Sequence, residues 1–373
     1  MIVKIGDVIS EYSVRNKFDE NIPVYSVTNE KGFCTGYFSK EVASKDKSTY
    51  KIVPRGYFAY NPSRINVGSV DWQKYEDRVI VSPLYVVFGV SDRLDRQYLL
   101  HYLKSDMMLS FIKEYATGSV RDNLKLADLG KFPINLRPVE EQRQIATTLD
   151  KIDDLIAKRR QQLDKLDELV KSRFVEMFGD PTYNPKGYKI KKLSQLGELN
   201  RGVSKARPRN SPELLGGPYP LVQTGEVTAS ELYINTYENT YSEKGLAQSR
   251  MWPKGTLCIT IAANIAQTAI LNIDACFPDS VVGFIPGKEV TQIYMHYWFT
   301  FFQKILEEQA PQVAQKNINL KILNDLDVMV PERTLQEQFE KLVNQTDKSK
   351  LAIQKSLDKL EILKKALMQK YFG

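Results

Sequence analysis

The sequence is poor in the residues from which proteins build disulfide frameworks and metal centres. Its 373 residues include three cysteines and two histidines. Cys34, Cys258 and Cys276 are far apart and odd in number, which excludes a disulfide framework or a CxxC metal site. His101 and His296 also lie far apart and offer neither a metal cluster nor a catalytic triad. We expect both histidines to have packing or surface roles.

Long hydrophobic segments are missing as well. No uninterrupted apolar run approaches the roughly 18–20 residues that span a bilayer. The N-terminal MIVKIGDVIS has neither a long apolar core nor a small-residue cleavage site, so we expect no secretion and no membrane partner. With 42% hydrophobic and 26% charged residues, the composition is that of a folded globular protein, and the length predicts two or more units.

Catalytic motifs are missing too. An amino-group DNA methyltransferase should carry an Asn/Asp-Pro-Pro-aromatic tetrapeptide, which neither Asn61–Arg64 nor Asn184–Gly187 provides. The stretch GFIPGK, Gly283–Lys288, is one residue too short for a phosphate-binding Walker loop and reads as a turn. Asp279 follows Pro278 without the Glu-x-Lys of a nuclease carboxylate cluster. We therefore expect no enzyme activity on this chain, and no metal or cofactor bound to it.

What the sequence does contain is an internal repeat. Residues 120–179 align without gaps with residues 314–373, and both copies end in Phe-Gly. Self-similarity at a fixed period predicts repeated architecture, here a tandem duplication of about 190 residues. The matched pairs include Asn123/Asn317, Leu126/Leu320, Leu129/Leu323, Gln142/Gln336, Gln144/Gln338, Asp153/Asp347, Lys165/Lys359, Leu166/Leu360 and Leu169/Leu363.

Each copy ends in a predicted long helix. From Pro138 the chain has no Gly or Pro until Gly179, and apolar residues recur at alternating spacings of four and three, which is typical of a coiled coil. About 40 residues give a helix of roughly 60 Å. The predicted seam also takes in Arg159 and Arg173, while Thr346, Lys350 and Lys364 interrupt it in the second helix. The seam residues are Ile145, Leu149, Ile152, Ile156, Leu163, Leu166 and Val170, then Phe339, Val343, Ile353, Leu357, Leu360 and Leu367.

The parts before the helices are rich in Tyr, Val, Ile, Thr, Gly and Pro, which indicates short β-strands with helices near residues 97–115 and 291–309. We predict an α+β fold with two β-rich recognition domains, residues 1–137 and 181–330. Two long helices, residues 138–180 and 331–373, join them. If these helices pair, the shortest connection makes them antiparallel, and the molecule has a pseudo-twofold internal repeat.

Basic loops in both β-rich domains point to nucleic acid. The formal net charge is +7, a weak hint by itself. Lys186–Arg209 holds eight basic residues and one acid, and Lys40–Arg64 holds six basic residues and two acids among tyrosines. Such loops suit phosphate contact, although each alone could be a solvated face.

Bases are read by side chains that can form two hydrogen bonds to one base edge: Arg or Lys to guanine, and Asn or Gln to adenine. Each candidate could instead be a turn or surface residue. The candidates in the first domain are Asn29, Lys31, Asn61, Ser63 and Arg64, with Arg121 for phosphate. Those in the second domain are Arg207, Arg209, Gln223, Thr224, Gln248, Arg250, Asn264 and Gln267, with Lys205 and Lys316 for phosphate.

The repeat carries a family resemblance. The strings FPINLRPVEEQRQIATTLDKIDDLI and LDVMVPERTLQEQFEKLVNQTDKSK combine a hydrophobic strand, a proline, a Glu-Gln pair and a long helix. In the second copy, one more residue lies between the proline and the glutamine. WPKGTLCIT and the strand SPLYVVF, Ser82–Phe88, add to the match. In these features the chain resembles the specificity subunit of a type I restriction–modification system.

The resemblance implies a division of labour. Each β-rich domain would read one half of a bipartite, asymmetric sequence in double-stranded DNA. The helices would set the spacing and dock two methyltransferase subunits that use S-adenosylmethionine. Restriction subunits would add translocation and cleavage with ATP and Mg. The setting would be the cytoplasm of a bacterium or archaeon, at the nucleoid. The alternatives are a scaffold with two protein-binding domains and, disfavoured by the missing tetrapeptide, a self-sufficient methyltransferase.

Overall fold

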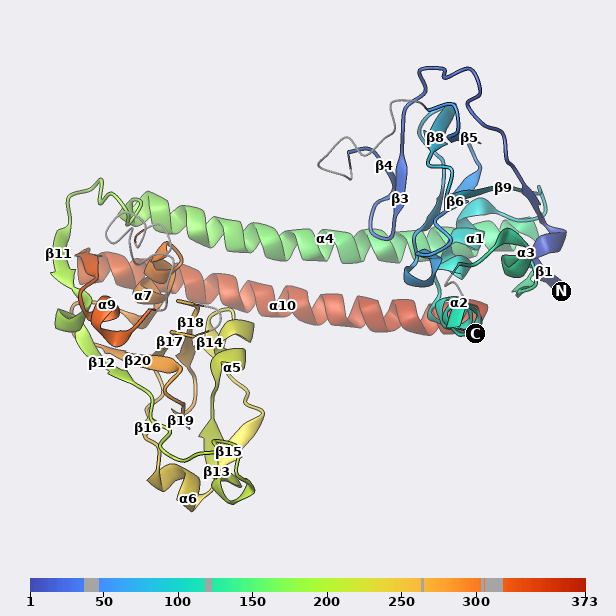
Figure 1. The fold of residues 1–373 in the computed structure, drawn as a ribbon. Coiled ribbons are helices and arrows are strands. Elements are labelled where there is room, and N and C mark those ends of the chain that lie inside the picture. Colours follow the sequence, from blue (N-terminus) through green and yellow to red (C-terminus); the bar gives the residue numbers. More distant parts are fainter. Residues whose placement is uncertain (37–46, 118–122, 263–264, 303–304, 306–317) are drawn as a thin grey trace. The chain divides into compact units, whose positions relative to one another are not determined.

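The computed structural model describes the whole chain except residues 37–46, 118–122, 263–264, 303–304 and 306–317 (Figure 1). The chain divides into two compact units. The first is Met1–Arg160 with Gln354–Gly373, and the second is Gln161–Ile353. Each unit therefore contains one β-rich domain and a part of each long helix.

The first unit is built on a four-stranded antiparallel sheet in the order β2-β9-β6-β7. Phe58 and Phe88 stack across it with ring centroids 5.0 Å apart, and both rings are fully buried. The sheet strands are β2 (Ile9–Glu11), β6 (Phe58–Tyr60), β7 (Val70–Trp72) and β9 (Val86–Val90). Three two-stranded ladders are β1 (Ile2–Lys4) with β10 (Pro133–Asn135), β3 (Ser26–Thr28) with β4 (Gly32–Cys34), and β5 (Lys51–Pro54) with β8 (Arg78–Val81). The short helices are α1 (Arg96–Leu103), α2 (Asp106–Thr117) and α3 (Leu126–Leu129).

The second unit has a five-stranded sheet in the order β12-β20-β17-β18-β14. Its strands are β12 (Gly197–Arg201), β14 (Tyr233–Ile234), β17 (Leu257–Thr260), β18 (Thr268–Leu271) and β20 (Val281–Pro286). A second sheet, β15-β13-β19-β16, comprises β13 (Leu215–Leu221), β15 (Asn239–Tyr241), β16 (Met251–Trp252) and β19 (Ala275–Cys276). β11 (Lys189–Lys192) pairs with β21 (Asp327–Val330). The short helices are α5 (Thr224–Ala229), α6 (Glu243–Ala247), α7 (Gln292–Phe299) and α9 (Leu320–Asn324).

The two domains share a core topology. The first-domain order β2-β9-β6-β7 corresponds strand by strand to β12-β20-β17-β18, and both are antiparallel. In each domain an outer ladder, β1–β10 or β11–β21, pairs the first strand of the domain with the last one before the long helix. The duplication seen in the helical segments therefore extends through the β-rich parts.

The predicted long helices are α4 (Val139–Phe178) and α10 (Arg333–Phe372). In the first unit Asp153 pairs with Lys364 and Arg160 with Glu361, so the two helix segments run antiparallel. In the second unit Lys350 pairs with Asp167, while the ring of Phe174 meets that of Phe339, again antiparallel. The predicted fold class, two β-rich domains with two long antiparallel helices and an internal repeat, is confirmed.

The two lysines that interrupt the predicted seam are explained by ion pairs. Lys364 lies 2.6 Å from Asp153, and Lys350 contacts both Asp167 and Glu231. Asp153 and Asp167 of α4 each neutralise a lysine of α10.

Most of the predicted seam is buried, but not all of it. Arg173, which the pattern had placed in the seam, is exposed and pairs with Glu176 of its own helix. Its charged head group stays in water, because burying it would cost solvation free energy. The half-buried positions are Leu163, Leu166, Ile353, Leu360 and Leu367. The buried ones are Ile145, Leu149, Ile152, Ile156, Val170, Phe339, Val343 and Leu357.

One pair of glutamines in the repeat is a structural clamp. Gln142 is fully buried, and its amide accepts from the Asp95 backbone and donates to the carbonyls of Arg93 and Arg137. Its counterpart Gln336 makes the same set of bonds in the second unit, to the backbones of Thr291, Glu289 and Pro331. Asp95 and Thr291 cap α1 and α7, so each glutamine ties a long helix to the short helix of its domain.

The repeated Phe-Gly ending also has a packing role. Phe372, at the end of α10, packs on Tyr98 of α1 with ring centroids 5.1 Å apart. Phe178, at the end of α4, packs on Tyr294 of α7 at 5.0 Å. Each phenylalanine is buried in the core of its own unit. The helix that closes one copy thus completes the core around the other copy's domain.

Two local predictions differ from the structure. The helix expected near residues 97–115 breaks into α1 and α2, because the Ser105 hydroxyl accepts from Met108 N and starts a new helix. The strand expected at Ser82–Phe88 is a turn followed by β9, since Tyr85 N donates to Ser82 O. Of the helix expected near 291–309, the structure describes α7, which ends at Phe299, and the helical residues Phe302 and Ile305.

Candidate nucleic-acid interface

The first domain has a polar cavity that gathers four of its five base-reading candidates. The cavity, of about 570 Å³, is lined by Asn29, Lys31, Asn61 and Arg64. The first two come from the turn between β3 and β4, and the other two from the loop that follows β6. Tyr85 and Ser69 also line this cavity, and no sequence pattern had marked them. Ser63 lies outside it.

The loop after β6 is held by its own side chains. The Asn61 carboxamide oxygen accepts from the backbone and the hydroxyl of Ser63, at 3.1 and 2.9 Å. Arg64 N donates to Asn61 O at 2.9 Å. This Asx turn uses the Asn61 oxygen and the Ser63 hydroxyl internally, whereas the Arg64 side chain is exposed. Of these three side chains, Arg64 is therefore the one that the turn leaves exposed to solvent and outside its own hydrogen bonds.

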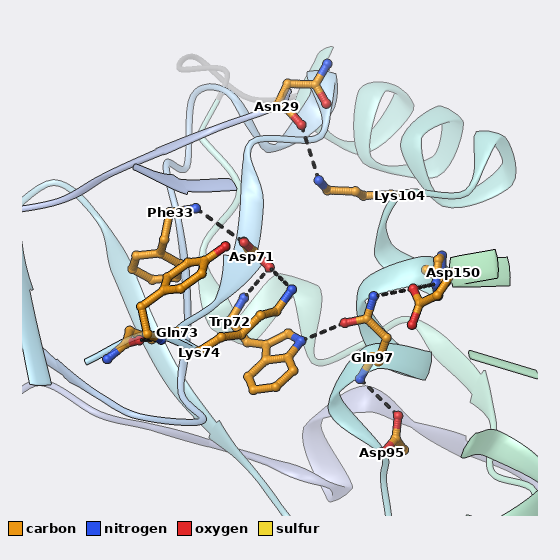
Figure 2. A network of polar contacts seen from close by, with 12 residues as sticks. Asn29, Phe33, Asp71, Trp72, Gln73, Lys74, Asp95, Gln97, Lys104 and Asp150 are labelled. Carbon is orange, nitrogen blue, oxygen red and sulfur yellow. Dashed lines mark hydrogen bonds and ion pairs between the residues drawn. The ribbon is translucent and has the colours of Figure 1, made fainter. Parts of the chain in front are cut away.

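A buried carboxylate holds the β3–β4 hairpin in place (Figure 2). Asp71 of β7 is 5% exposed, and it accepts from Phe33 N at 3.2 Å and from Trp72 N at 2.8 Å. Lys74 lies 3.4 Å from the same carboxylate. A side chain on Gly32, whose φ is +60°, would collide with Asp71, so the hairpin fits closely over this acid. An isolated acid in the otherwise apolar stretch before Trp72 was the one sequence signal for this role.

The polar network continues from this strand into the long helix, as Figure 2 shows. Trp72 Nε1 donates to Gln97 Oε1 at 2.9 Å, and Gln97 Nε2 donates to Asp150 Oδ1 at 2.7 Å. His101 contacts the same oxygen at 2.8 Å. Burial alone would raise the pKa of Asp150, but the hydrogen bonds from His101 and Gln97 hold it below its usual range. Asp150 belongs to α4, so strand β7 is linked to that helix through α1.

The C-terminal end of α1 also contacts the β3–β4 hairpin. Lys104 Nζ donates to Asn29 O at 3.3 Å (Figure 2). Burial lowers the pKa of Lys104. The backbone of the hairpin tip is therefore held from two sides, while the side chains of Asn29 and Lys31 remain exposed.

The second domain has a larger cavity, lined by a different set of the candidate residues. It measures about 830 Å³, and Arg209, Gln223 and Thr224 line it. Gln223 caps α5, and its backbone N donates to Glu226 Oε2 at 3.0 Å, which leaves its own exposed side chain at the rim. Further lining residues that no sequence pattern had marked are Tyr237, Glu238 and Asn239.

Two other second-domain candidates make internal contacts. Gln248 Oε1 accepts from Ala206 N at 2.9 Å, so this carboxamide fastens the basic loop. Arg250 lies 2.8 Å from Glu198 and 4.1 Å above the Trp252 ring. The hydrogen bond from Arg250 lowers the pKa of Glu198. These contacts place Gln248 and Arg250 outside the cavity lining.

The remaining candidates divide into two groups. Lys205, Arg207 and Gln267 are exposed but do not line the cavity. Arg121, Asn264 and Lys316 lie outside the described residues. Over the described part of the chain, no group of three His, Cys, Asp or Glu side chains could hold a metal. Likewise, none of the helices assigned there is long and apolar enough to cross a membrane.

Comparison with known proteins shows which family has this architecture. The family model of the type I restriction modification DNA specificity domain matches residues 2–168 and 185–365, one match per repeat. The putative type I restriction enzyme MjaX specificity subunit of Methanocaldococcus jannaschii is 21% identical over 354 residues, covering 89% of this chain and 80% of the relative. The MjaVIII specificity subunit of the same organism is 23% identical over 74% of this chain and 69% of its own length.

Solved structures show the same fold. The type I restriction–modification S subunit from M. genitalium aligns with a TM-score of 0.59 at 15% identity, over all of this chain and 96% of that one. A chain from a study of complex assembly and conformational transition of the type I R-M system gives 0.59 at 17% identity, with 97% of it covered. With the two family matches spanning most of its length, the chain belongs to the type I restriction modification DNA specificity family, as a non-catalytic specificity subunit with two target recognition domains.

Proposed function

We propose that this chain reads a bipartite, asymmetric target in double-stranded DNA, one half-site per domain. The observation that carries the proposal is the pair of cavities, each lined by side chains of the types that can bond to base edges. Asn29 and Arg64 line the first cavity, and Gln223 and Thr224 line the second. Because the two sets differ, the two half-sites differ.

We further infer that the long helices dock two methyltransferase subunits. Leu169 and Leu363 occupy matching places in the repeat, and they are 45% and 47% exposed. Exposed apolar positions that recur in both copies suit two copies of one partner rather than solvent. The other exposed apolar residues on these helix segments are Leu155 and Ile362 in the first unit, and Val175 and Leu351 in the second.

The chemistry then belongs to the partners. The methyltransferase subunits would use S-adenosylmethionine on adenine, and restriction subunits would use ATP and Mg for translocation and cleavage. This chain supplies the address and the scaffold, in the cytoplasm at the nucleoid.

The test is DNA binding by the purified chain with and without its methyltransferase subunit. We expect the affinity for duplex DNA to fall steeply as salt rises, because phosphate contacts release counterions. A gel shift on random duplex across a salt series measures this. Salt-independent binding, or none with the partner present, would refute the proposal and favour a protein-binding scaffold.

A further inference from the structure

Asp279 is the meeting point of three arginines in the second domain. It lies two residues before β20, and its backbone carbonyl accepts from Arg201 Nε. Its carboxylate forms an ion pair with Arg209, and Oδ2 lies 3.6 Å from Arg207 Nη2. Three arginines from β12 and the following loop thus converge on one acid, and the cluster keeps a net positive charge.

The loop that carries these arginines is fastened at several points. Gly202 N donates to Val281 O at 2.8 Å, and a side chain at Gly202 would collide with the backbone of Pro278. Arg207 Nη1 donates to Ser204 O at 2.7 Å and to Ala206 O at 2.8 Å. The loop and the segment that bears Asp279 therefore form one local structure.

The arginine side chains are held but not covered. Those of Arg207 and Arg209 remain 56% and 44% exposed. A guanidinium has five N–H donors, so contact with one carboxylate leaves others free for phosphate oxygens. Arg209, which pairs with Asp279, and Ser280, which follows Asp279 in the chain, line the 830 Å³ cavity together with Gln223.

We propose that Asp279 is a positioning residue, whose carboxylate pre-orients Arg207 and Arg209 for contact with DNA phosphates beside the second-domain cavity. This inference rests on the proposed DNA-reading function. Free arginines lose considerable rotamer freedom when they bind, and an arginine already held in place loses less. Asp279 would thus favour DNA binding although its own charge repels phosphate.

The direction in which one substitution changes the affinity for DNA separates positioning from simple charge repulsion. Asp279→Asn removes one negative charge, and so does the control Glu238→Gln, whose exposed acid lines the same cavity. Repulsion alone predicts tighter DNA binding by both variants. Positioning predicts that Asp279→Asn binds roughly 5- to 30-fold more weakly, whereas Glu238→Gln binds as tightly as the wild type or more so.

The assay is fluorescence anisotropy with the chain and its methyltransferase subunits on a duplex carrying the methylated site mapped in cells. Each variant is titrated across a salt series, since each lost phosphate contact lowers the slope of log K against log salt by about 0.9. We expect Asp279→Asn to lower the slope by about 1–2, and Asp279→Glu to restore it. A merely destabilised domain would change the active fraction and not this slope.

A double-mutant cycle covers the case in which Asp279→Asn folds poorly. In a background of Arg207→Gln with Arg209→Gln, removing the acid should have no further effect on affinity or slope. Binding by Asp279→Asn as tight as wild type, with an unchanged slope, would overturn the inference. If the wild-type complex itself shows no salt-dependent binding, the proposed function fails instead.

Discussion

Replacing either Leu169 or Leu363 by aspartate should remove one methyltransferase subunit from the assembly. The two leucines are equivalent in the repeat, and each exposes nearly half of its surface, 45% and 47%. Burying a whole leucine is worth about 1.5–3 kcal/mol, so covering the exposed half contributes roughly 1 kcal/mol at each site. A carboxylate in its place must also be desolvated, which raises the loss to about 3 kcal/mol or more and weakens docking at least 100-fold.

The variants should still fold. An aspartate on an exposed helix face costs under about 0.7 kcal/mol of helix propensity. Matched controls are Lys171→Asp and Lys365→Asp, two residues further along, at equivalent and exposed positions on the other side of the buried stripe.

Native mass spectrometry of each variant with excess methyltransferase subunit reads the stoichiometry directly. We expect two subunits on the wild type and on the lysine controls, one on either leucine variant, and none on the double variant. Two subunits on both single variants, with wild-type affinity, would refute docking at these positions.

Two further predictions concern the domains. Arg64→Ala should cost about 1–3 kcal/mol on the first half-site and leave the second unchanged, measured as affinities for duplexes altered in one half at a time; equal losses on every duplex would make Arg64 a phosphate contact. Burial lowers the pKa of His296 to about 4, so the neutral ring contributes stability that is complete above pH 6.5 and is lost as the pH falls towards 4. Between pH 7 and 4.5 this amounts to about 2.5 kcal/mol of unfolding free energy, and urea titrations of His296→Gln should show a correspondingly flatter pH dependence.

The long helices and the duplication were predictable because heptad spacing and ungapped self-similarity are local properties of the sequence. In the sequence, Gln142 and Gln336 appeared only as a matched pair of the repeat, and nothing indicated that each one ties a long helix to a short one. This role depends on backbone groups almost 50 residues away, which no periodicity reveals. Likewise, Lys350 and Lys364 looked like defects in a seam, since their acidic partners lie on the other helix.

The residue types of the candidate base readers were predictable from the sequence, but their locations in the structure were not. Arg250 and Gln248 have the chemistry of base readers, yet Glu198 and the Ala206 backbone engage them within the domain. Gln223 has the same chemistry as Gln248 and lines a cavity. The difference is set by long-range packing that brings sheet edges together. The positioning acids, Asp71 and Asp279, had no motif because their partners come from distant segments.

Mapping methylated adenines in DNA tests the central claim, that each domain reads its own half-site. The DNA comes from cells that carry this chain with its methyltransferase subunits, or a chimera in which residues 181–330 come from a relative. The account predicts a bipartite methylated site in the first case, and in the chimera a change in one half-site only. A change in both half-sites, or a methylated site with no second half, would contradict it.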